Sequence, residues 1–170
     1  MPTNAYMFLV AGLIPMIVGA IYYNPKVAGG AWMKINGFTE ESLKRANMAV
    51  IFIVSYIFAV LIAFFMSSVV IHQSAVWSMM YPDIAEAGSA AQQQFNELMQ
   101  NYGNNHRSFY HGAIHGFWIT VFFALPLIGT VALFERRGWK YILVHTIYWL
   151  ITLSLVGGFV CAVLKYQPMG

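Results

Sequence analysis

Three histidines are spaced so that together they could bind a metal ion. His111 and His115 are four residues apart, so on a helix they share one face. His72 closes an earlier apolar stretch that would run in the opposite direction, which puts it at a similar depth. Imidazole is a ligand for Zn, Cu, Fe and Ni, and two such helices could also clamp a b-type haem. His72, His111 and His115 are therefore candidate ligands for Zn, Cu or haem, with His106 nearby.

A second interpretation of these histidines needs no metal. They would hydrogen bond across helices or lie where the helix ends meet water. No Cys, Asp or Glu is near them in the sequence to complete a ligand set, and supporting carboxylates could come only from the loop after His72. We therefore predict no cofactor, and binding of Zn, Cu or haem is the alternative.

His145 belongs to another apolar stretch, where Tyr148 and Trp149 follow it. An ionisable group inside a membrane-spanning helix is a functional candidate by default. The expected role here is a hydrogen bond between helices, to the backbone carbonyl that Pro126 leaves without its helical partner.

The elements that would position these side chains are four long apolar stretches. All nine Lys and Arg residues and all six Asp and Glu residues lie outside them. A helix of about 20 residues crosses a hydrocarbon core of ~30 Å, and in lipid every backbone polar group must be bonded internally. The sequence therefore predicts an all-α polytopic membrane protein: one domain, 1–170, with four transmembrane helices in an antiparallel bundle. The expected spans are 4–23, 48–71, 113–134 and 141–164.

Composition and charge agree with this class. Charged residues make up 9% of the chain, against about 25% in soluble domains. The net charge of +3 does not indicate nucleic-acid binding, because the basic residues flank the apolar stretches. The lipid bilayer is the expected partner.

Basic residues also predict the orientation, because Lys and Arg concentrate in cytoplasmic loops. The first and third loops carry seven basic residues, against two in the second loop and the C-terminal tail. We expect a multi-pass protein of the inner (cytoplasmic) membrane with both termini on the outer side. The seven are Lys26, Lys34, Lys44, Arg45, Arg136, Arg137 and Lys140.

The long second loop predicts an amphipathic helix over about 83–102. Apolar residues such as Phe95 and Leu98 share one face of it, and Gln and Asn residues lie mostly on the others. Such a helix would lie on the outer membrane surface or cap the bundle. The alternative is a docking or lid helix for a partner.

Small residues indicate close helix packing in the last two spans. Gly112 and Gly116 are four apart, and Gly157 and Gly158 would do similar work on the fourth span. Small residues let helix backbones approach closely. This packing interface could form within one chain or across a homo-oligomer.

Several functional classes are disfavoured. No charged residue lies within an apolar stretch, whereas ion-coupled transporters usually need one. There is no P-loop, dinucleotide fingerprint or HExxH motif, and no convincing Ser/His/Asp set. The sequence therefore favours a non-enzymatic protein, and a pore or carrier built from four spans would need an oligomer.

Two runs of residues resemble a family of small bacterial membrane proteins, the domain of unknown function seventeen-sixty-one. The first run contains Tyr22-Tyr23-Asn24-Pro25 followed by Trp32-Met33-Lys34, and the second contains His111-Gly-Ala-Ile-His115-Gly116 and Ala124-Leu125-Pro126. The resemblance covers almost the whole chain except the outer loop, and it implies a four-helix integral membrane protein without implying an activity. It marks a distinctive inner loop: Tyr23, Asn24, Pro25, Trp32 and Lys34.

The leading hypothesis for function is a small membrane component that self-associates or binds a membrane partner protein. It could form part of an oligomeric pore or carrier. In this reading the inner loop is re-entrant or interfacial, and the outer helix is a docking element. The alternative is a metal- or haem-binding membrane protein that uses the outer histidines.

Overall fold

Three helices are long and apolar enough to cross a membrane in the computed structural model, which describes residues 2–166. The first is α5, Met48–Val70, and the last is α10, Trp139–Val163. The middle one, Phe109–Phe134, consists of α8 (Phe109–Ile119), the π-helical η3 (Thr120–Ala124) and α9 (Leu125–Phe134). The described residues contain helices and loops and no strand, which confirms the all-α prediction.

The expected first span, 4–23, does not form a fourth helix of that kind. It folds as α1 (Met7–Ala11) and α2 (Leu13–Tyr22), then bends by 53° into η1 (Pro25–Gly29) and α3 (Gly30–Asn36). The physical reason lies at the bend. Asn24 is extended and its side chain accepts from the backbone N–H of Lys26, so the chain begins a new helix at Pro25.

The predicted outer helix, 83–102, is also wrong in extent. The structure has a short 3-10 turn, η2 (Asp83–Ala85), and then α7 (Ala90–Tyr102), which Ser89 caps. Gly88 separates them with a φ of +78°, a left-handed conformation that a helix cannot contain. Two further short helices are α4 (Glu40–Lys44) and α6 (Gln73–Met80), and α6 was not predicted.

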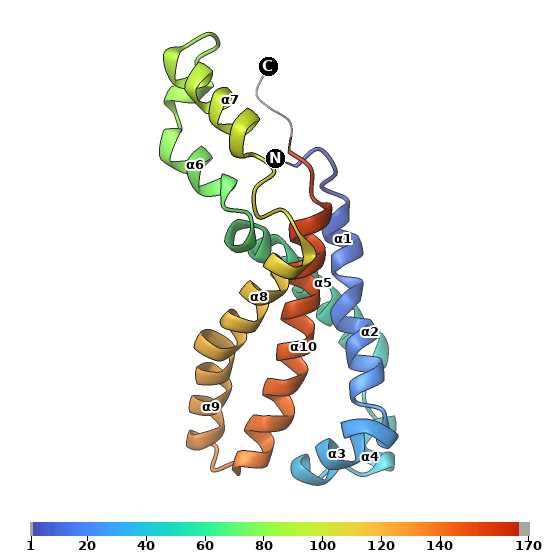
Figure 1. Cartoon of the computed structure of the whole chain (residues 1–170). Helices are drawn as coiled ribbons and strands as arrows, with labels where there is room; N and C mark the ends of the chain where they lie inside the picture. Colours follow the sequence, from blue (N-terminus) through green and yellow to red (C-terminus); the bar gives the residue numbers. More distant parts are fainter. Residues whose placement is uncertain (1, 167–170) are drawn as a thin grey trace.

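α10 lies at the centre of the arrangement, with α8 and α9 on one side, α1 and α2 on the other, and α5 behind (Figure 1). α6 and α7 extend beyond the bundle at the end where Thr3 meets Lys165, here called the terminal end. α3 and α4 lie at the opposite end, here called the loop end. Met1 and Gly170 lie outside the described residues, so the predicted placement of the termini stays a prediction.

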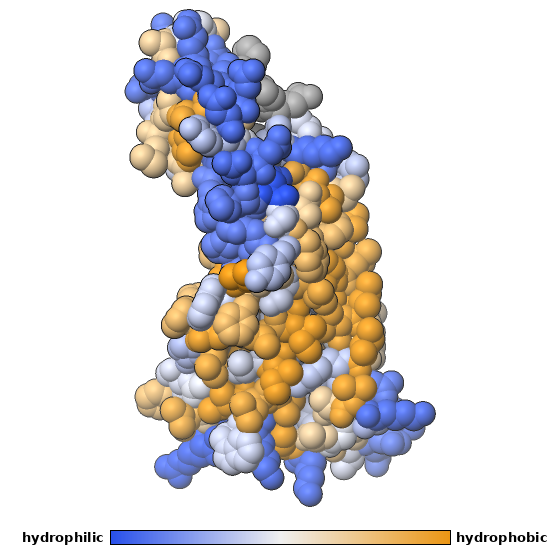
Figure 2. Space-filling model, in the orientation of Figure 1, coloured by the Kyte–Doolittle hydropathy of each residue, from blue (hydrophilic) through white to orange (hydrophobic). Residues whose placement is uncertain are grey.

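The face of the bundle seen in Figure 2 is mostly apolar over the middle of the helices and more hydrophilic toward both ends. The protein core is small and lies toward the terminal end. It contains Met66 and Val70 of α5, Val156 and Cys161 of α10, and Ala11 of α1. Most other large apolar side chains of the long helices face outward.

The four predicted packing glycines bring α8 and α10 together within the chain. A Cβ added at Gly112 would overlap the carbonyl of Gly157, and one at Gly116 would overlap the carbonyl of Leu153. A Cβ at Gly158 would reach within 3 Å of the Phe109 ring. The backbones of α8 and α10 therefore touch where only glycine leaves room.

This contact predicts that Gly116→Ala destabilises the protein by about 1–3 kcal/mol, because the helices must move apart. Thermal unfolding in detergent, followed by tryptophan fluorescence, measures the effect. Gly129→Ala is the matched control: Gly129 is also helical, but an added Cβ there meets nothing within 4 Å. Equal melting temperatures for the two variants would contradict the packing role of Gly116.

Candidate functional site

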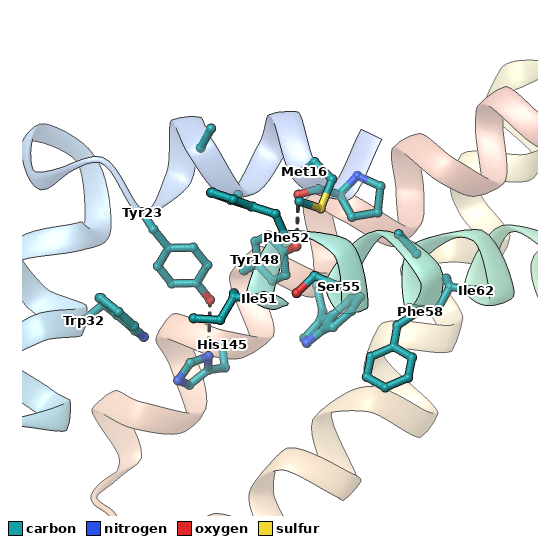
Figure 3. A pocket seen from close by; sticks show the side chains of 15 residues that line it. Met16, Tyr23, Trp32, Ile51, Phe52, Ser55, Phe58, Ile62, His145 and Tyr148 are labelled. Carbon is teal, nitrogen blue, oxygen red and sulfur yellow. Dashed lines mark hydrogen bonds between the residues drawn. The ribbon is translucent and has the colours of Figure 1, made fainter. Parts of the chain in front are cut away.

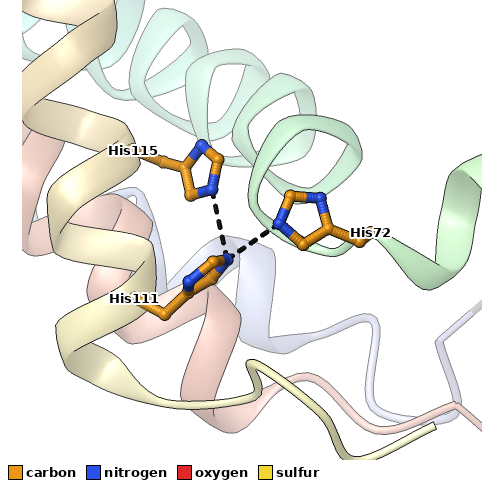
Figure 4. Close-up of side chains that lie close together, drawn as sticks. All are labelled: His72, His111 and His115. Carbon is orange, nitrogen blue, oxygen red and sulfur yellow. Dashed lines mark hydrogen bonds between the residues drawn. The ribbon is translucent and has the colours of Figure 1, made fainter. Parts of the chain in front are cut away.

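His72, His111 and His115 converge at the terminal end of the bundle (Figure 4). The Nε2 atom of His111 lies 2.9 Å from Nε2 of His72 and 3.1 Å from Nε2 of His115. One ligand atom from each ring falls within 4.8 Å of the other two. The structure thus brings together the three predicted ligands, while His106 stands beside them with its ring centroid 5.0 Å from that of His111.

The three histidines are positioned by two helix ends, the start of α8 for His111 and His115 and the end of α5 for His72. Ser108 caps α8 by accepting from the backbone N–H of His111, and the glycine contact with α10 fixes the face that α8 turns toward α5. His72 lies between the end of α5 and the start of α6. The next residue, Gln73, donates to the carbonyls of Tyr102 and Asn105, which holds this turn against the end of α7.

Cys161, which is fully buried on α10, connects the two sides of the site. Its Sγ lies 3.4 Å from the carbonyl of Val70 and 3.3 Å from the carbonyl of His106. Val70 precedes His72 by two residues, and His106 leads into α8. A thiol is a weak donor, but here it sits between both segments that carry the histidines.

Arg107 holds the loop before α8 from the other side. Its guanidinium donates to the carbonyl of Leu164 and stacks over the ring of Tyr166 at 5.5 Å. Burial lowers the pKa of Arg107 from its ordinary value, yet arginine starts so high that it stays charged. The loop that precedes His111 is therefore anchored to the end of α10.

Hydrogen bonding alone does not satisfy three converging Nε2 atoms. A neutral imidazole has one N–H and one lone pair, so Nε2 of His111 is either a single donor or a single acceptor. Two partners at 2.9 and 3.1 Å exceed that capacity. In a tetrahedral site with metal–nitrogen bonds of 2.0–2.1 Å, ligand nitrogens stand about 3.3 Å apart. The two distances from His111 are close to that spacing, and the third pair lies within 4.8 Å.

The same distances fit a single ion better than a haem. Two axial ligands on opposite sides of one iron place their nitrogens about 4 Å apart at bond lengths near 2 Å, whereas the facing atoms of His72 and His111 are 2.9 Å apart. The set is also neutral, with no carboxylate in the cluster of described residues. Such a set suits Zn or Cu with a fourth position left for water or an anion.

A second cluster lies toward the loop end, where tyrosines join α2 to α10. The hydroxyl of Tyr22 donates to the carbonyl of Val144, and that of Tyr148 donates to the carbonyl of Pro15. The hydroxyl of Tyr23 lies 3.2 Å from Nδ1 of His145. The expected hydrogen bond between helices at His145 is present, but its partner is Tyr23 and not a carbonyl freed by Pro126.

The distinctive inner loop divides between two places. Tyr23 and Trp32 face inward and line a pocket with His145. Asn24 and Pro25 form the bend described above, and Lys34 is exposed. The sequence singled out Tyr23 and Trp32 as part of the distinctive inner loop. Nothing in the sequence indicated that His145 would lie beside them.

Some residues that build these sites were missed. Cys161 contacts two backbone carbonyls from segments that are distant in sequence. Asn4 was given no role, yet its side chain bonds the carbonyl of Val163 and the N–H of Lys165. The only signals available were a polar residue at the start of an apolar stretch and a lone thiol within another.

The helices and the two clusters define a small helical protein with three apolar, span-length helices, a triple-histidine site and a tyrosine–histidine site. Residues 6–161 match the family model described as protein of unknown function (DUF1761), and the chain belongs to that family. Searches of the curated proteins and of the solved structures found no match.

Proposed function

We propose that this protein is an integral membrane protein that binds one transition-metal ion, Zn or Cu, through His72, His111 and His115. The convergence of three Nε2 atoms carries the proposal, because a neutral imidazole at the centre cannot satisfy two partners while a cation satisfies all three. His72 is exposed and the other two are half-buried, so an ion can enter from the water at the terminal end.

In the proposed topology four segments cross the bilayer. The fourth is Met7–Tyr22 together with Pro25–Asn36, which meet at a 53° bend. The support is composition and charge: the helices are apolar over their middle, and basic residues concentrate in the loops at the loop end. The loop end then faces the cytoplasm, and the terminal end with its histidines faces outward.

The metal proposal predicts one Zn or Cu per chain in protein purified in detergent without chelators, or after loading and desalting. His111→Ala removes the central ligand and should lower the metal content to less than a tenth, since two imidazoles bind far more weakly than three. Elemental analysis by plasma mass spectrometry measures both proteins.

His106→Asn is the matched control for that measurement. It removes the adjacent imidazole, which is outside the triad, and asparagine tolerates the left-handed φ of 61° found at this position. It should keep full metal content. Metal that is absent from the wild-type protein after loading, or that persists in His111→Ala, would overturn the proposal.

The topology predicts which introduced cysteines a membrane-impermeant maleimide can reach. Tyr6→Cys and Glu86→Cys should be labelled in intact cells, and Lys44→Cys only after the membrane is permeabilised, because these exposed positions lie at opposite ends of the bundle. The wild-type chain is the blank, because its single cysteine, Cys161, is buried. Labelling of all three from one side would rule out this topology.

A second candidate function is a membrane component that self-associates or binds a membrane partner. The observation in its favour is the segment formed by α6 and α7, which extends beyond the bundle (Figure 1). It carries exposed apolar side chains. Met79 is 84% exposed and Tyr81 is 56% exposed. Exposed apolar groups on an otherwise hydrophilic segment mark a contact surface.

This candidate predicts one species larger than the 19.1 kDa monomer in mild detergent. Light scattering coupled to size exclusion, corrected for bound detergent, gives the protein mass. Met79→Ser should shift that mass toward the monomer if α6 contributes to the contact. A strictly monomeric wild-type protein would count against self-association.

A further inference from the structure

A cavity of about 600 Å³ lies between α2, α3, α5 and α10, toward the loop end (Figure 3). Its volume is within the range of small-molecule sites. Most of its lining is apolar or aromatic, and none of the lining residues is an Asp, Glu, Lys or Arg. The cavity is far along the helices from the histidine triad, so it is a separate site.

The polar groups of this cavity gather at one side. Tyr23 and His145 form a pair there, and Trp32 lies beside Tyr23 with ring centroids 5.5 Å apart. Ser55 of α5 faces the same space. The remaining walls carry aromatic rings, among them Phe52, Phe58, Tyr148 and Trp149.

The Tyr23–His145 pair keeps one hydrogen-bond donor unused while the imidazole is neutral. If the Tyr23 hydroxyl donates to Nδ1, the proton of His145 is on Nε2 and is free. If instead Nδ1 carries the proton and donates, the Tyr23 hydroxyl is free to donate. Both residues line the cavity, so in either tautomer the pair has one donor available beside it, in mostly apolar surroundings where an unmade hydrogen bond is costly.

We propose that this cavity binds a neutral, lipid-soluble ligand with a flat carbonyl-bearing ring, of the quinone class. The carbonyl oxygen accepts from the Tyr23–His145 pair, the ring lies among the aromatic side chains, and an apolar tail extends along α5. The absence of charged lining residues selects a neutral ligand. The position of the cavity between apolar helices lets such a ligand enter from the lipid phase.

The hydrogen-bond donor of the Tyr23–His145 pair should favour binding of a quinone over binding of a plain hydrocarbon chain. An acyl chain would fill the apolar part of the cavity equally well but would leave the donor unpaired, which costs binding free energy. A ring carbonyl satisfies it. The test must therefore compare ligands that differ only in the carbonyl.

The experiment uses the full chain in phosphatidylcholine nanodiscs and a decyl-substituted benzoquinone as the probe. Trp32 and Trp149 line the cavity, so bound quinone should quench tryptophan fluorescence in a saturable way. Decylbenzene has the same tail without carbonyls and should compete at least ten-fold more weakly. Equal competition by decylbenzene, or the absence of saturable quenching, would overturn the proposal.

Variants test the donor directly. Tyr23→Phe and His145→Phe each leave one partner that can still donate, so each should weaken quinone binding only slightly. The double variant removes both donors and should lose about ten-fold or more, beyond the product of the single effects. An additive, small loss in the double variant, with unchanged melting temperature, would show that the pair does not bind the carbonyl.

A filling variant tests the location. Gly19 borders the cavity, and an added Cβ there meets only Tyr148, at an ordinary 3.8 Å. Gly19→Leu should therefore extend into the space and abolish saturable quenching. Gly129→Leu is the control, because Gly129 has nothing within 4 Å and lies elsewhere. Unchanged binding in folded Gly19→Leu would place the quinone outside this cavity.

Discussion

The close approach of α8 and α10 is the constraint on which the rest of the structure depends. At Gly112 and Gly116 the two backbones touch, and any side chain there would collide with carbonyls of α10. In the membrane setting proposed above, association of apolar helices brings little hydrophobic gain, so such close backbone contact would supply the packing. Because this face of α8 is committed to α10, His111 and His115 turn toward α5, where they meet His72.

The terminal end is then fixed by a few polar contacts to the end of α10. Cys161 stands between the carbonyls of Val70 and His106, and Arg107 donates to the carbonyl of Leu164. Asn4 ties the first helix to the same place. These contacts satisfy backbone groups at helix ends, which would otherwise be unpaired, and they hold the three segments around the histidines in register.

At the loop end, the arrangement depends on a break in the first apolar segment and not on a contact between glycines. The first helix stops at Tyr22, and the bend at Asn24 and Pro25 folds α3 back beneath the bundle. Tyr23 sits at the bend itself and reaches His145 of α10. A straight span through this position would carry the chain away from α10, so the bend is what creates the aromatic cavity.

Much of this could be predicted from the sequence, because long apolar stretches without charged residues are easy to recognise. Met48–Val70 and Trp139–Val163 agree with the expected spans 48–71 and 141–164 within two residues. The helical spacing of His111 and His115 could also be recognised from the sequence. The glycines needed where backbones touch could be recognised in the same way.

Tertiary structure decided what local pattern does not contain. The apolar stretch 4–23 looked like a full span, but its end is set by Asn24 capping the next helix. The outer helix is divided at Gly88, where a left-handed turn outweighs an amphipathic pattern. The pairing of Tyr23 with His145 depends on contacts between residues 122 positions apart. Hydropathy indicates which segments form long apolar helices, but which faces meet is decided only when side chains from distant segments compete for the same space.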